Sequence, residues 1–243
     1  MLQAPTSGSA EVNGAARLLP LDHFQGSLGQ RVYQSLQQAI LTLAYRPAEI
    51  IRKPEICDRL GVSRSPVADA VARLAADGLV DVVPQAGTFV ARLSMTHIRE
   101  GAFIREAIEV AAAELVAPQI TDDQLRELRR NLMLQEALVA DGDHQGFMEL
   151  DGQMHEMMLS FTGFPRLPQV SQTAWLNVHR ARQLILPVQG RLATTLAEHR
   201  AILAAFEARD PMAARQAVQH HLRQLLTYLQ PLSLIHISEP TRH

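Results

Sequence analysis

The sequence predicts a mainly helical chain of two parts, an N-terminal winged helix-turn-helix and a C-terminal all-α helical bundle. Two observations lead to this fold class. Between residues 30 and 93, the sequence has the pattern of one helix, then of a pair of short helices, and then of a β-hairpin. From Met95 onward the strand-like patterns stop, and apolar residues recur at helical spacing as far as residue 229. We therefore place the first domain at residues 30–93 and the second at residues 94–231.

The first predicted helix covers residues 30–44, where Val32, Leu36, Ile40 and Leu43 form one apolar stripe. Pro47 ends it. Residues 50–60 are predicted to form the next short helix, with Ile56 and Leu60 facing inward.

Gly61 then supplies the left-handed conformation that closes this short helix, and Ser63 is placed to cap the following one. In that helix Val67, Val71 and Leu74 share one buried face. Two short helices joined by a glycine turn are typical of a helix-turn-helix, whose second helix enters a DNA major groove. On this stretch alone, the alternative is an ordinary pair of antiparallel helices.

A β-hairpin is predicted directly after the pair of helices, at residues 79–92. Two runs of β-branched residues flank the short link from Gln85 to Gly87. The order of helix, helix-turn-helix and hairpin is that of a winged helix.

Six helices are predicted in the second half. Thr121 and Gln124 have the spacing of a capping box, and Gly163, Pro187 and Pro211 mark breaks. The predicted ranges are residues 96–116, 121–139, 144–161, 167–186, 191–208 and 211–229. Such a run of helices indicates an α-bundle.

The composition is that of a water-soluble, packed chain. Hydrophobic residues make up 47% of the 243 residues, and no apolar run approaches the length of a membrane span. The net charge of −2 excludes a globally basic surface but permits a local basic face. A single cysteine, Cys57, excludes a disulfide framework and indicates a reducing compartment, so we expect a cytoplasmic protein without membrane contact.

Both ends of the sequence differ in character from the two domains. Residues 1–29 lack a secretory signal and are rich in Gly, Ser and Ala, which predicts a mobile tail. Residues 232–242 read as the conceptual translation of a transposase-based sequencing adapter. We therefore expect residues 232–243 to be an artefact and leave His236 out of the chemistry.

Four residues of the second half form a predicted metal-binding set. Asp151 and His155 lie four residues apart in one helix, so their side chains share a face. His199 and His221 lie equally far on either side of the turn at Asp210, which brings them level on antiparallel helices. Three imidazoles and one carboxylate suit Zn²⁺, Ni²⁺, Mn²⁺ or Fe²⁺. The alternative is that these are ordinary core or surface histidines. His220 is expected to face solvent.

The N-terminal domain resembles the winged helix of the GntR family of bacterial transcription regulators. The motifs are Leu60-Gly-Val-Ser-Arg-Ser-Pro-Val67, Leu74-Ala-Ala-Asp-Gly-Leu-Val80 and Pro84-Gln-Ala-Gly-Thr-Phe-Val90. The helical half resembles the FCD ligand-binding domain of the FadR subgroup, whose pattern Asp-x-x-x-His…His…His also falls on Asp151, His155, His199 and His221. The resemblance covers about residues 30–229.

This resemblance implies a homodimer that binds a short palindromic operator in double-stranded DNA. It places Arg64 and Ser65 at bases or phosphates and Gly87 at the tip of the wing. The family usually has arginines where this chain has Pro54 and Ala68, and Arg52 and Lys53 are expected to replace one of these contacts. The predicted DNA-binding residues are Arg52, Lys53, Ser63, Arg64, Ser65, Arg73 and Gly87. For Arg73, a solvated charge or a carboxylate partner is the alternative.

The resemblance also implies a small carboxylate or related metabolite as effector. Arg105 would point into the cavity and grip it, and the alternative for Arg105 is an ion pair with Glu109. Asn177 and Arg180 are further effector-binding candidates, whereas Trp175 is expected to serve in packing.

Three hypotheses follow. The first is a metal-containing, ligand-responsive regulator, a repressor rather than an enzyme. The second is a metal-dependent enzyme acting on small carboxylates with an accessory winged helix, in which Glu198 is the only general base near in sequence, unless it is a surface carboxylate. The third is a purely structural metal site with regulation through a protein partner.

Overall fold

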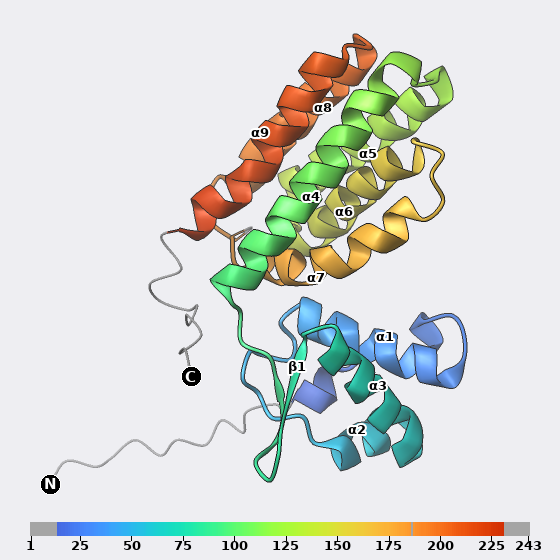
Figure 1. Cartoon of the computed structure of the whole chain (residues 1–243), viewed down its shortest axis with the longest axis vertical. Coiled ribbons are helices and arrows are strands. Elements are labelled where there is room, and N and C mark those ends of the chain that lie inside the picture. Colours follow the sequence, from blue (N-terminus) through green and yellow to red (C-terminus); the bar gives the residue numbers. More distant parts are fainter. Residues whose placement is uncertain (1–13, 186, 231–243) are drawn as a thin grey trace, which may run out of the picture. The chain divides into compact units, whose positions relative to one another are not determined.

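The computed structural model describes residues 14–185 and 187–230, without the side chains of residues 169 and 172–174. The chain divides into two compact units, residues 1–92 and residues 93–243 (Figure 1). The predicted adapter segment lies outside the described residues, as do residues 1–13 of the predicted tail. Among the helices of the described ranges, none is long and apolar enough to cross a membrane.

The first unit is a winged helix built on three α-helices and a hairpin. Its helices are α1 (Leu28–Leu41), α2 (Lys53–Leu60) and α3 (Arg64–Ala76), and its strands are β1 (Val80–Val83) and β2 (Gly87–Val90). The core forms where α1 packs on α3, because the apolar stripes of the two helices face each other. Its buried side chains include Val32, Leu36, Ile40, Ile56, Val67, Val71 and Leu74. The predicted winged helix is confirmed.

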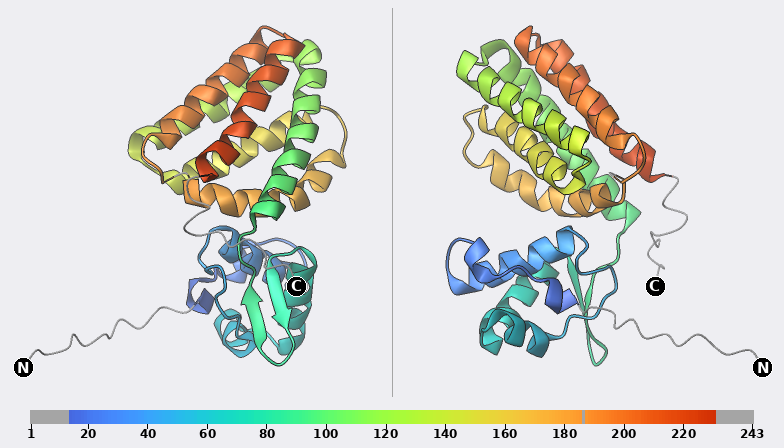
Figure 2. Two further views of the ribbon diagram at one scale, coloured as in Figure 1. Left: turned by 60° about the vertical axis from the view of Figure 1, so that its left-hand side comes forward. Right: turned by 180° about the vertical axis from the view of Figure 1, so that it is seen from behind.

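The wing is an antiparallel hairpin in which Val80 pairs with Val90 and Val83 pairs with Gly87 (Figure 2). The turn is made by Pro84, Gln85 and Ala86, and Gln85 takes the left-handed conformation (φ 61°). Gly87 therefore begins β2, beside the turn, and does not form the tip.

Ile50 and Ile51 correct our prediction for the second helix. They do not belong to a helix, because Ile50 bridges Phe89 and the N–H of Ile51 donates to the carbonyl of Thr88 at 2.8 Å. The helix starts only at Lys53, with Pro54 in its first turn. These two β-branched residues are extended and pair with the outer side of β2, next to the two-stranded hairpin.

The predicted mobile tail is also wrong for residues 14–27. Two short 3₁₀ turns, Gly14–Arg17 and Leu21–His23, pack against the winged helix. Leu18 is 1% exposed, and the carbonyls of Leu18 and Leu19 accept hydrogen bonds from Arg59 and Ser35. The first helix starts two residues before its predicted position, with Ser27 as its N-cap.

The second unit is an all-α bundle, as predicted. Its six helices are α4 (Met95–Val116), α5 (Asp122–Asp141), α6 (His144–Ser160), α7 (Leu167–Ile185), α8 (Arg191–Glu207) and α9 (Pro211–Leu229), and a 3₁₀ turn, Ala117–Gln119, follows α4. The predicted capping box at Thr121 and Gln124 is present.

The arrangement of the helices places the candidate metal ligands inside the bundle. Helix α4 packs on α9, α7 and α6, while α5 packs on α6 and α8. Helices α8 and α9 run antiparallel side by side (Figures 1 and 2). The main apolar core is drawn from α4, α5, α6, α8 and α9, and it surrounds a group of buried polar side chains.

Candidate metal centre and DNA-reading face

Helix α6 carries the first two predicted ligands. Asp143 caps it by accepting a hydrogen bond from the N–H of Gly146 at 2.9 Å. Met154 and Met158 anchor the inner face of α6 in the core, and the helix period therefore turns Asp151 and His155 inward as well. Both side chains are fully buried.

The turn between α8 and α9 positions the other two predicted ligands. Asp210 caps α9 by accepting from the N–H groups of Met212 and Ala213, and the helices then return alongside each other. As the equal spacing from this turn predicts, His199 and His221 meet in the interior, and their ring centroids lie 4.6 Å apart. His220 is exposed, as expected.

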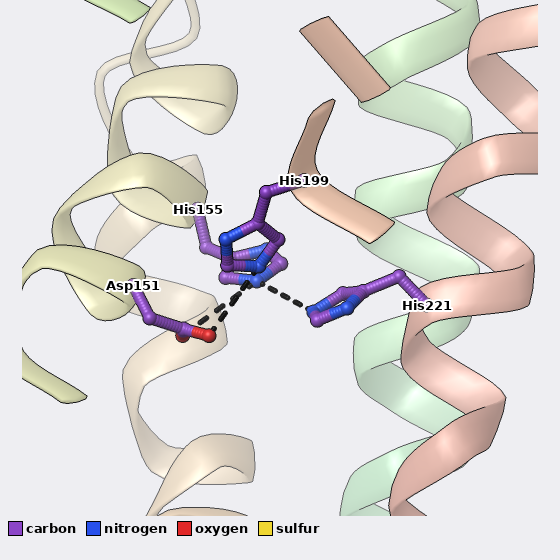
Figure 3. A group of neighbouring side chains, drawn as sticks. All are labelled: Asp151, His155, His199 and His221. Atoms are coloured by element: carbon purple, nitrogen blue, oxygen red, sulfur yellow. Dashed lines mark hydrogen bonds and ion pairs between the residues drawn. The ribbon is translucent and has the colours of Figure 1, made fainter. Parts of the chain in front are cut away.

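The four side chains converge on one point (Figure 3). One potential ligand atom from each residue lies within 4.8 Å of all the others. The Nε2 atoms of His155 and His221 are 3.1 Å apart, and Nε2 of His199 is 3.4 Å from Oδ1 of Asp151. This is the set Asp151, His155, His199 and His221 that the sequence predicts.

Each imidazole is held from behind through its other ring nitrogen. Nδ1 of His155 lies 2.6 Å from Oε2 of Glu109, on α4. Nδ1 of His199 lies 2.7 Å from Oε1 of Gln135, and Nδ1 of His221 lies 2.7 Å from Oε2 of Glu198. Each of these oxygens can accept a hydrogen bond from a protonated Nδ1, and with that tautomer the lone pair of Nε2 faces the centre. This is the tautomer that a metal ion requires.

Arginines brace the three carboxylates of the centre. Arg105 pairs with Glu109 at 2.6 Å, and Arg191 pairs with Glu198 at 2.7 Å through two parallel contacts. Arg182, on α7, pairs with Asp151. All three arginines are at least 94% buried. Their charges compensate the buried carboxylates and fix their orientation.

The protonation states at this centre favour a cation. Burial alone would raise the pKa of Asp151, but the charge of Arg182 is the largest opposing effect, and the pKa is held well below its usual range. Burial lowers the pKa of His199 to about 3, and it lowers the pKa of His221 in the same way. An ionised carboxylate and neutral imidazoles are the forms that bind metal ions.

Unsatisfied atoms test whether the centre fits a metal ion. Oδ1 of Asp151 and Nε2 of His199 are buried, and neither has a hydrogen-bond partner among the described residues, whereas Oδ2 of Asp151 pairs with Arg182. Buried polar atoms of this kind need an explanation, and a divalent cation on the three nitrogens and one oxygen supplies it. The residues therefore fit a divalent metal ion.

The predicted effector residues lie on two helices of the bundle. Arg105 forms an ion pair with Glu109, which the sequence predicts as the alternative to effector binding. Its guanidinium also lies 4.3 Å from the ring centroid of Trp175. Arg180 is fully buried and Asn177 half-buried, both on α7. Effector binding by these three residues stays a prediction.

Glu198 corrects one expectation. It is not a surface carboxylate, because it is 7% exposed and accepts from both His221 and Arg191. Burial alone would raise the pKa of Glu198, but the hydrogen bonds and charges of His221 and Arg191 stabilise its charged form and lower the pKa. A carboxylate so engaged is poorly placed to act as a general base.

Sequence reasoning missed several supporting residues of the centre. Gln135 and Asn131 are buried polar residues within the apolar stripe of α5, and that interruption is the signal that could have revealed them. Arg182 carries no comparable signal, since another arginine, Arg180, lies two residues before it on α7.

The helix-turn-helix has the local geometry that the sequence predicts. Gly61 closes α2 in the left-handed conformation (φ 65°). Ser63 takes the N-cap position of α3, although its side chain makes no capping hydrogen bond. Arg64 and Ser65 follow at the exposed start of α3.

The other predicted DNA-binding residues fall into two places. Arg52, Lys53 and Gly87 line one surface hollow between the start of α2 and the wing. Arg73 instead lies over the ring of Tyr33, 4.0 Å from its centroid. DNA contacts by these residues remain predictions.

Comparison with known proteins agrees with both domains. Residues 28–90 match the family described as bacterial regulatory proteins, gntR family, and residues 100–224 match the FCD domain. The HTH-type transcriptional repressor RspR of Escherichia coli (strain K12) is 30% identical over 198 residues, which are 82% of this chain and 87% of RspR.

Two solved structures share the fold. E. coli McbR/YncC superposes with a TM-score of 0.76 at 20% identity, over 86% of this chain and 99% of its own. A GntR-type transcriptional regulator from Rhodococcus sp. RHA1 gives a TM-score of 0.74 at 25% identity, with the same shares covered. The chain belongs to the GntR family of bacterial regulatory proteins and is a transcription regulator with a winged helix-turn-helix domain and an FCD domain.

Proposed function

We propose that this regulator is a repressor that binds a palindromic operator as a homodimer and is released by a small organic acid at a metal centre. The observation that carries the proposal is the buried set of Asp151, His155, His199 and His221, with every imidazole fixed from behind. Regulators of the GntR family bind DNA operators, and FCD domains bind small-molecule effectors.

The centre suits an effector site better than a structural site. A divalent ion that takes six ligands, such as Mn²⁺ or Ni²⁺, would keep open positions when four protein atoms hold it, and it would act as a Lewis acid toward a carboxylate. Arg105 lies behind the ligand His155, with which it shares Glu109, so an anion at the centre would lie close to a guanidinium. A closed structural site needs no such cation.

Regulation would follow from differential affinity. The effector can change DNA binding only if it binds one arrangement of the dimer more tightly than the other. Named as a repressor, RspR supports the same direction of control here. The enzyme alternative is weakened because Glu198, the only candidate general base near in sequence, is engaged by His221 and Arg191.

Metal content and DNA binding test the proposal together. The purified full-length protein should contain about one divalent ion per chain, and His199→Ala and His221→Ala should lose it. His220→Ala is the matched control, because His220 is exposed and lies next to His221 on α9. Light scattering should show a dimer.

Fluorescence anisotropy with a fragment of the protein's own promoter region then tests control. The metal-loaded protein should bind this fragment selectively at moderate salt, and an organic acid should weaken the binding. No selective binding by the metal-loaded protein would contradict the proposal. If chelation lowers the melting temperature but no acid raises it, the site is structural instead.

A further inference from the structure

A pocket between α6 and α7 adjoins the metal centre. Its volume is about 180 Å³, and it is lined by Gly152, Glu156, Leu159, Pro168, Ser171 and Trp175. Gly152, Glu156 and Leu159 form the stripe of α6 next to the stripe that carries Asp151, His155 and Met158. The pocket therefore lies one helix face away from the metal ligands.

Trp175 borders both the pocket and the centre. Its ring lines the pocket and also meets the ring of His155 edge-on, with centroids 5.7 Å apart. Arg105 lies against the same indole, 4.3 Å from its centroid. One side chain thus touches the pocket, a metal ligand and the arginine predicted to hold the effector.

Two buried hydrogen-bond donors at this position have no acceptor among the described residues: Nε1 of Trp175 and Nη2 of Arg105. A buried donor without an acceptor costs free energy, so a ligand that supplies the acceptor is favoured there. A carboxylate has two acceptor oxygens and matches the charge of the guanidinium.

The walls of the pocket favour an apolar body. Leu159, Pro168 and the Trp175 ring are apolar, the hydroxyl of Ser171 already donates to the carbonyl of Leu167 at 2.8 Å, and the remaining polar side chain, Glu156, is exposed. A cavity of about 150 Å³ lined by apolar side chains is known to hold benzene. A sugar-like acid has several hydroxyls, and against these walls most of them would lack a partner, since only Glu156 offers a free carboxylate.

Building on the proposed function, we propose that the effector is a carboxylic acid with one apolar group about the size of a benzene ring. Its carboxylate accepts hydrogen bonds from Nε1 of Trp175 and Nη2 of Arg105 beside the metal centre. Its apolar group occupies the pocket between α6 and α7. Trp175 is then an effector-contacting residue and not only a packing residue.

The test compares acetate, benzoate and gluconate on the zinc-loaded full-length protein. Calorimetry gives the affinities, and Trp175, the only tryptophan in the chain, reports binding by its fluorescence. Benzoate should bind at least about tenfold more tightly than either other acid, because only its ring fills the pocket. Gluconate binding as tightly as benzoate would overturn the proposal.

Two variants separate the head group from the body of the acid. Gly152→Leu should fill the pocket, because Gly152 lines it. The helix should tolerate the change, since a Cβ at this position meets nothing within 4 Å and leucine has a higher helix propensity than glycine. Benzoate affinity should fall about tenfold while acetate affinity is unchanged, and Gly152→Ala is the matched control. Trp175→Phe keeps the ring but removes the donor, so all bound acids should weaken by about tenfold.

Failure of this inference is distinguishable from failure of the proposed function. If acids bind but Gly152→Leu affects acetate and benzoate equally, the pocket assignment is wrong while the metal-centred effector site stands. If no acid binds the zinc-loaded wild-type protein, both are wrong. Circular dichroism and zinc content of each variant show that the fold is intact, and the wild-type comparison decides the matter without any variant.

Discussion

Acid should destabilise the metal-free helical domain, because two imidazoles at its centre are held neutral by burial. The pKa of His199 is lowered to about 3, and that of His221 is lowered for the same reason. In the unfolded chain both titrate near the ordinary pKa of about 6.5. Between these values the unfolded chain binds protons that the folded chain does not, so stability falls as pH falls.

The magnitude follows from the two pKa values of His199. Lowering the pH from 7 to 5 should reduce the free energy of unfolding by about 2 kcal/mol through this residue alone. His221 acts in the same direction. The carboxylates do not interfere in this window, because the pKa values of Asp151 and Glu109 are lowered and their stabilisation is lost only in stronger acid.

Urea denaturation in the presence of a chelator measures this effect. Trp175 fluorescence follows the helical domain specifically, since it is the only tryptophan and lies on α7. In His199→Gln the loss between pH 7 and pH 5 should shrink by about 2 kcal/mol. His220→Gln should keep the wild-type dependence, because His220 is exposed. A wild-type loss below about 0.5 kcal/mol would refute the reasoning.

Three further predictions concern the outer partners, the DNA contact and the N-terminal segment. Glu198→Ala should weaken zinc affinity by about 10- to 100-fold in a chelator competition, because it frees the ring of His221. Glu207→Ala, in an exposed ion pair on the same helix, should not change it. Arg64→Ala should weaken operator binding and, if the contact is to phosphate, reduce the slope of log affinity against log salt by about one. An unchanged affinity would remove Arg64 from the DNA-reading face. Leu18→Ala should cost the winged helix roughly 2–5 kcal/mol of unfolding free energy, measured by thermal denaturation. Leu19→Ala, at a 38% exposed position, is its control, and equal losses would argue against a packed N-terminal segment.

The helices and the centre were predictable because their signals are local or follow from simple topology. Apolar spacing and proline breaks placed α6, α7, α8 and α9 within about one residue of their bounds. His199 and His221 could be paired because a short turn forces two helices to return side by side. This argument needs no knowledge of the rest of the fold.

The errors arose where burial depends on distant parts of the chain. Gly14 and Ala15 look like flexible linker residues, yet both are buried, and the N–H of Gly14 donates to Glu49 at 2.7 Å. Ile50 and Ile51 fit either a helix or a strand, and pairing with β2 decides between them. Arg182 reaches Asp151 from another helix, and no local pattern encodes such a contact.

The predicted ligands of the centre are spread over α6, α8 and α9, and this spacing has a consequence for the stability of the folded domain. A metal ion there would join segments that are 70 positions apart in the chain, from Asp151 to His221, much as a covalent staple would. The staple is reversible, so its strength depends on free metal, adding about 2.7 kcal/mol at a concentration 100 times the dissociation constant. The lifetime of the folded domain would then rise and fall with the supply of that metal.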